Sequence, residues 1–88
     1  MFDTPSPAEI TQHFKAMTDS VTLINNTIAD DSEALRNFGD ASEVNLMITR
    51  NTDHLEIQLA KDWAKDDSRD KTSYTDAITA GKNYVANN

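Results

Sequence analysis

Apolar residues recur along residues 10 to 28 at alternating spacings of four and three positions. The stripe consists of Ile10, Phe14, Met17, Val21, Ile24 and Ile28. A period of 3.5 residues keeps these side chains on one side of a helix, which is typical of a coiled-coil seam. The pattern predicts a long, coiled-coil-like helix whose seam packs either inside its own domain or against another chain.

The beginning of this helix has an unusually complete set of start residues. Ser6 can cap the helix, Pro7 suits its first position, and Glu9 stands where it completes a capping box with Ser6. We therefore expect a helix over about residues 6 to 29.

The far end of the seam is interrupted. Asp31 takes the next seam position, after which Leu35 and Phe38 restore the register and Gly39 offers a helix stop. Residues 25 to 33 also combine weak helix formers with Asp30, which stands three residues before Glu33 and could cap a fresh start. We therefore expect a kink or a break near residues 29 to 32 and an extension to about residue 38.

A second helix is predicted over about residues 41 to 64. Asp40 can cap it, and the apolar residues that follow helical spacing are Val44, Ile48, Leu55, Leu59 and Trp63. Leu46 and Ile57 lie off this stripe, which indicates a second neighbour for the helix. The alternative is a short strand at residues 43 to 49, where Val44, Leu46 and Ile48 alternate.

A third helix is predicted over about residues 73 to 86, capped by Thr72 or Ser73. Gly81 falls on its apolar stripe, which indicates close approach of the helix carrying Leu55 and Leu59; alternatively, Gly81 only weakens the end of a short helix. The residues expected to pack the last two helices are Leu55, Leu59, Trp63, Ile78, Gly81 and Val85.

These elements predict an all-α fold, with a long N-terminal helix followed by an antiparallel helical hairpin. Residues 1–88 form one small domain, in which residues 6–38 are an oligomerisation or docking helix and residues 40–88 are the hairpin. A chain of 88 residues without cysteine buries only roughly 60 to 65% of its unfolded surface, so oligomerisation is a natural way to gain stability. We therefore expect the seam from Ile10 to Ile28 to be a protein interface.

Charge and hydropathy narrow the range of partners. Of the net charge of −7, residues 1 to 48 carry −6 and residues 49 to 88 carry −1. Nucleic acid is not expected as a partner because its phosphates bind Lys and Arg, whereas a basic protein surface fits. The sequence has no signal-peptide pattern and no membrane span, so we expect a soluble protein that is not secreted by a standard signal.

Two stretches contain residues that could carry chemistry. On a helix, the polar residues around His54 scatter instead of converging, which favours a solvated or capping role for His54 over catalysis or zinc binding. The acidic residues Asp62, Asp66, Asp67 and Asp70 lack EF-hand spacing and are interleaved with basic residues, so a solvated loop is favoured over a calcium site. We expect no catalytic residue, metal or cofactor.

Two stretches of the second half of the chain read "TRNTDHLEIQLAKDW" and "YTDAITAGKNYVAN". Over about residues 49–87 these stretches resemble small uncharacterised proteins of tailed bacteriophages. The matching positions are Arg50, Asn51, His54, Leu55, Glu56, Leu59 to Asp62, and Ala77 to Tyr84. Because that family has little assigned chemistry, the resemblance implies a phage origin more than an activity.

Two classes of function follow. The first is a non-enzymatic virion structural or assembly protein, associated with the capsid, neck or fibre, that binds itself and other virion proteins. It would be found in the virion, or in the host cytoplasm during assembly, and would bind no nucleic acid, membrane or small-molecule substrate. The second is a small phage effector that binds and inhibits a host protein, with its acidic half acting as a nucleic-acid mimic.

Overall fold

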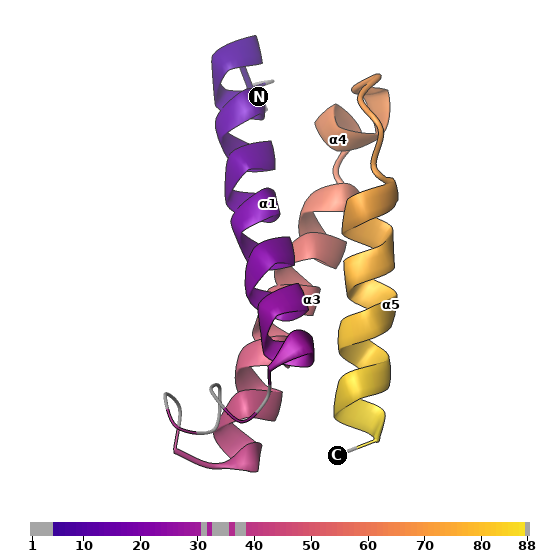
Figure 1. Cartoon of the computed structure of the whole chain (residues 1–88). Helices are drawn as coiled ribbons and strands as arrows, with labels where there is room; N and C mark the ends of the chain where they lie inside the picture. Colours follow the sequence, from indigo (N-terminus) through magenta and orange to yellow (C-terminus); the bar gives the residue numbers. More distant parts are fainter. Residues whose placement is uncertain (1–4, 31, 33–35, 37–38, 88) are drawn as a thin grey trace.

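The first helix begins where its start residues predicted. A computed structural model describes residues 5–30, 32, 36 and 39–87, and helix α1 spans Pro7–Ala29 (Figure 1). The Glu9 backbone N–H donates to Ser6 Oγ at 3.2 Å, and the Ser6 N–H donates to Glu9 Oε1 at 3.3 Å. This reciprocal capping box satisfies two backbone donors that the first turn leaves without helical partners.

Helix α1 ends at the predicted break. Asp30 leaves helical geometry, with φ −145° and ψ 79°, while its backbone N–H still donates to Asn26 O. The predicted extension of the seam through Asp31, Leu35 and Phe38 lies outside the described residues. Gly39 has a φ of +98°, which L side chains rarely adopt and which suits the stop predicted there.

The second predicted helix is two helices. Helix α3 spans Ala41–Leu59 and helix α4 spans Asp62–Asp66, so a single helix over residues 41 to 64 is wrong. The chain turns at Lys61, whose φ of −75° and ψ of 148° are extended. Asp40 caps α3 by accepting the Glu43 N–H at 2.9 Å, and residues 43 to 49 are helical, which excludes the alternative strand.

The last helix, α5, spans Thr72–Ala86, and its N-cap residue, Lys71, makes no side-chain cap hydrogen bond. Neither Thr72 nor Ser73 caps it. Asp70 Oδ1 instead accepts the Thr72 N–H at 2.9 Å and the Thr72 hydroxyl at 2.6 Å. A carboxylate in this position also interacts favourably with the positive end of the helix dipole.

The three long helices lie side by side. Figure 1 shows α1 and α5 running in one direction and α3 in the other. Each of the three packs against both of the others, and their buried side chains form one core cluster. Helix α1 is therefore part of the same core as the following helices. The described part of the chain is all-helical, and none of its helices is long and apolar enough to cross a bilayer.

Candidate functional site

The α1 seam faces the core of its own chain. Phe14, Met17, Val21 and Ile24 are at most 9% exposed. Ile10 is half-buried against the same cluster, and only Ile28 is classed as exposed, at 39%. In this fold α3 and α5 cover these four residues, and their role in an interface between chains stays a prediction. The seam follows the other alternative, in which it packs inside its own domain.

The residues expected to pack α3 against α5 lie around this core. Leu55 is fully buried, and Leu59, Trp63, Ile78 and Val85 are half-buried against the cluster. Gly81 is buried where the three long helices meet. A Cβ atom at Gly81 would lie 2.5 Å from Thr52 Cγ2, 3.3 Å from Ile48 Cγ2 and 3.5 Å from Ile24 Cγ2. Such contacts leave no room for a side chain.

Thr52 is a contact residue that the sequence analysis missed. It is 3% exposed, and its hydroxyl donates to Thr49 O at 2.9 Å. That internal hydrogen bond satisfies the hydroxyl, so its methyl group can pack against Gly81. Its neighbour Asn51 stands between Ile48 and Leu55 on the apolar stripe, yet the Asn51 side chain donates to Met47 O at 2.8 Å and is only half-buried.

His54 bridges two helices instead of being solvated or capping a helix. Its Nδ1 lies 2.9 Å from the Oγ of Ser20 on α1, and Ser20 is 6% exposed. A serine–histidine pair resembles part of a nucleophilic site, but such a site also needs an acidic group to orient the histidine. Among the described residues no carboxylate forms a hydrogen bond or ion pair with His54, and the Ser20–His54 contact links α1 to α3.

The short helix α4 brings Trp63 to α1. Trp63 stacks on His13 with ring centroids 4.8 Å apart and meets Phe14 edge-on at 5.7 Å. Phe14 also contacts Tyr74 of α5 at 5.6 Å. Offset and edge-on aromatic pairs add to the stabilisation from burial, so this cluster fastens α4 and α5 to the N-terminal half of α1. His13 is thus a packing residue.

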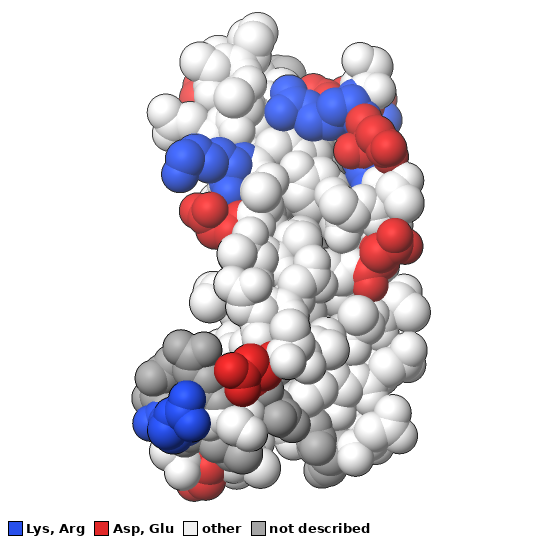
Figure 2. All heavy atoms as spheres, viewed as in Figure 1, with Lys and Arg blue, Asp and Glu red and all other residues white. Residues whose placement is uncertain are grey.

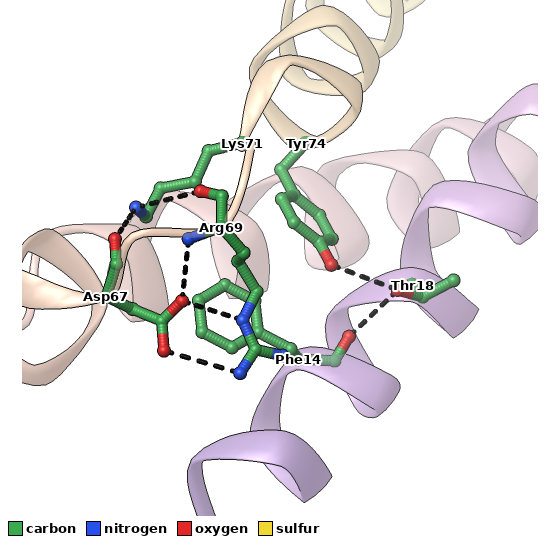
Figure 3. A network of polar contacts seen from close by, with 6 residues as sticks. All are labelled: Phe14, Thr18, Asp67, Arg69, Lys71 and Tyr74. Atoms are coloured by element: carbon green, nitrogen blue, oxygen red, sulfur yellow. Dashed lines mark hydrogen bonds and ion pairs between the residues drawn. The ribbon is translucent and has the colours of Figure 1, made fainter.

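The loop between α4 and α5 is held by its own charges (Figure 3). The Asp67 carboxylate accepts hydrogen bonds from Arg69 Nε at 2.7 Å, Arg69 Nη2 at 3.3 Å and the Arg69 N–H at 3.0 Å. These hydrogen bonds, from the side chain first and then the backbone, lower the pKa of Asp67. Lys71 Nζ donates to the carbonyls of Asp67 and Arg69.

Arg69 also connects this loop to α1. Its guanidinium carbon lies 4.2 Å from the centre of the Phe14 ring, a cation–π distance. Beside it, the Thr18 hydroxyl donates to Phe14 O at 2.9 Å and lies 3.1 Å from the Tyr74 hydroxyl (Figure 3). In the sequence Arg69 is one of the basic residues interleaved with these acids, and no local pattern reveals its contact with a ring 55 positions away.

Two acidic residues of this region are held by neighbouring residues of the chain. Asp67 is bound by Arg69, and Asp70 caps α5. Hydrogen bonds from the Thr72 side chain and backbone lower the pKa of Asp70. Within residues 5–30, 32, 36 and 39–87, no group of three His, Asp or Glu side chains is placed to hold a metal ion.

The surface carries both charged and apolar features. On the face in Figure 2, charged side chains lie toward the ends and edges, and an uncharged band runs lengthwise over α1 and α5. The exposed large aliphatic residues are Leu23 at 45%, Ile28 at 39%, Leu46 at 41% and Ile57 at 59%. Comparison of the chain with protein-family models, with curated proteins and with solved structures gave no match.

Proposed function

We propose that this chain is a non-enzymatic structural or assembly protein of a bacteriophage virion, associated with the capsid, neck or fibre. In this proposal it holds other virion proteins and further copies of itself through the outer surface of its helical bundle. The phage setting rests on the resemblance of residues 49–87 to small tailed-phage proteins. The proposed non-enzymatic role rests on the contacts that the polar side chains make within the bundle.

The observation that carries the proposal is that the polar groups capable of chemistry are each held by a separate partner. The His13–Trp63 stack and the Asp67–Arg69 pair both lie beside Phe14. His54 meets Ser20 further along α1. Catalysis requires such groups to converge on one reacting atom. Here each of these polar groups instead contacts one neighbouring side chain and helps to hold the helices together. Such a scaffold has its outer faces available for binding.

The arrangement of the helices suits this role. In the proposal, the 3.5-residue seam of α1 packs in a coiled-coil manner against a hairpin formed by α3 and α5. This produces a rigid rod-like unit, and its overall dimensions are 43 × 20 × 19 Å. A small rigid unit presenting the same faces in every copy is an economical component of a symmetric assembly.

The experiment that tests the proposal is quantitative mass spectrometry of particles purified from the phage that encodes the chain. We expect the chain at a fixed ratio to the capsid, neck or fibre proteins after washing at high salt. A matched sample of lysate proteins that do not co-purify with particles serves as the control. Absence of the chain from washed particles would overturn the virion assignment.

The alternative is a host-directed effector, which the charge distribution favours. Residues 1 to 48 carry −6 of the net charge of −7, as expected for a protein that occupies a basic, nucleic-acid-binding surface. Such an effector would be missing from particles and would co-purify from infected cells with one host protein. Nucleic acid would then displace it from that host protein, whereas a virion component would show no such competition.

A further inference from the structure

The outer face of α3 carries a second stripe that the core does not use. Leu46, Arg50, Asp53 and Ile57 recur at spacings of four, three and four residues, and all four are exposed. Leu46 is 41% exposed and Ile57 is 59% exposed. A helix with a seam of this spacing presents one continuous line of side chains to a neighbour.

This stripe lies opposite the face of α3 that packs in the bundle. The side chains that α3 buries are Val44, Ile48, Thr52 and Leu55. Arg50 and Asp53, between the two exposed aliphatic residues, have no ion-pair partner among the residues that the structure describes. The stripe is therefore an unpartnered helix face with apolar ends and a charged centre.

We infer that the outer face of α3 binds the same face of a second copy of this chain, with the two α3 helices antiparallel. The stripe is complementary to itself under a two-fold rotation. Leu46 and Ile57 are equally distant from the point between residues 51 and 52, and so are Arg50 and Asp53. In that arrangement Leu46 meets Ile57 of the partner subunit. Arg50 meets Asp53 of the partner subunit, and each pair forms twice.

The charges select the antiparallel orientation. In a parallel pair, Arg50 would lie opposite Arg50 of the partner subunit and Asp53 opposite the partner's Asp53, which is repulsive at both positions. Like charges repel in the parallel pair, and opposite charges attract in the antiparallel pair. Such charges determine the orientation of the two helices more than the affinity of the dimer.

The size of this face limits the affinity of the dimer. Ile57 lies eleven positions after Leu46, which is about 16 Å along the helix at 1.5 Å per residue. One such helix pair buries less than the roughly 1,200 Å² of a standard stable interface. We therefore expect a dimer that forms at micromolar to submillimolar concentration and becomes fully occupied where many copies are held together. This inference deepens the proposed function, which includes self-association, and rests on it only for the biological setting.

A charge-exchange experiment tests the pairing. Sedimentation equilibrium of the purified chain between about 5 and 500 µM should show a monomer–dimer equilibrium. Arg50→Asp and Asp53→Arg should each weaken dimerisation by about tenfold or more, because each creates two like-charge contacts. The double variant Arg50→Asp/Asp53→Arg should restore it. The control variants Lys15→Asp and Asp19→Lys change the charge equally on α1, at side chains 79% and 69% exposed, and should have little effect.

Disulfide trapping tests the orientation independently. The chain has no cysteine, so a mixture of the Leu46→Cys and Ile57→Cys variants should form a cross-linked dimer of one copy of each. Leu46→Cys alone should cross-link much more slowly. Three results would each overturn the inference. The first is a monomer throughout the concentration range, and the second is a double variant that dimerises no better than the single variants. The third is faster cross-linking of Leu46→Cys to itself than to Ile57→Cys. These readouts use no phage particles, so their failure is distinguishable from absence of the chain in virions.

Discussion

At the scale of single residues, Gly81 shows how a missing side chain can hold a bundle together. A methyl group there would meet Thr52 Cγ2 at 2.5 Å, a distance that forces a rearrangement. Gly81→Ala should therefore lower the free energy of unfolding by about 1 to 2 kcal/mol, although alanine is favoured over glycine in a helix by about 1 kcal/mol. Gly81→Leu should cost more, and urea denaturation measures both.

A second substitution identifies the cause of this loss. Thr52→Ser removes the methyl group that Gly81 meets and keeps the hydroxyl that donates to Thr49 O. Combining it with Gly81→Ala should recover much of the lost stability, so the two changes should be strongly non-additive. Simple additivity, or a Gly81→Ala protein as stable as the original chain, would mean that the helices do not approach closely at this point.

At the scale of elements, a substitution in the seam of α1 tests whether the seam packs inside its own chain or between two chains. Val21 is 9% exposed within the core cluster, so Val21→Asp buries a carboxylate without a partner. Its cost should be at least about 3 to 5 kcal/mol, enough to unfold a domain of ordinary stability. The matched control Leu23→Asp lies at a position 45% exposed on the same helix and should stay folded. Far-UV circular dichroism distinguishes them; a folded, monomeric Val21→Asp protein would instead identify the seam as an interface.

The loop between α4 and α5 should make the bundle sensitive to acid. Folding lowers the pKa of both Asp67 and Asp70, so their stabilising contribution is complete above the unfolded pKa of about 3.9 and is lost as the pH falls through the lower folded values. Stability measured by urea denaturation should therefore decline between about pH 5 and pH 2. Asp67→Asn/Asp70→Asn should flatten that decline, whereas Asp66→Asn, at an exposed neighbour, should leave it steep. Identical pH profiles for all three proteins would contradict a role for these carboxylates.

At the scale of the whole molecule, one core cluster joins all three long helices, which predicts a single cooperative unfolding transition. Trp63 is the only tryptophan and stacks on His13 of α1, so its fluorescence reports the docking of α4 on α1. Its urea transition should coincide with that of far-UV circular dichroism. Measurement at two protein concentrations separates folding from dimerisation. An earlier fluorescence transition would show that the α4 end opens on its own.

The local features of the helices were predictable from the sequence because they depend on neighbouring residues. Ser6 with Glu9 caps α1, Asp40 caps α3, and the apolar spacing marks the buried face of each helix. Such signals act within about one turn of chain, so they do not require knowledge of the fold.

The tertiary structure alone decided what covers each face. The spacing of Phe14, Met17 and Ile24 is equally suited to a partner in the same chain or in another, and the docking of α3 and α5 made the choice. The break at Ala60 and Lys61 has no local cause, since both residues are good helix formers; it places Trp63 against His13. The Ser20–His54 and Arg69–Phe14 contacts likewise join residues far apart in the chain. Their distances depend on how whole helices dock, which is a collective result of packing that no short stretch of sequence encodes.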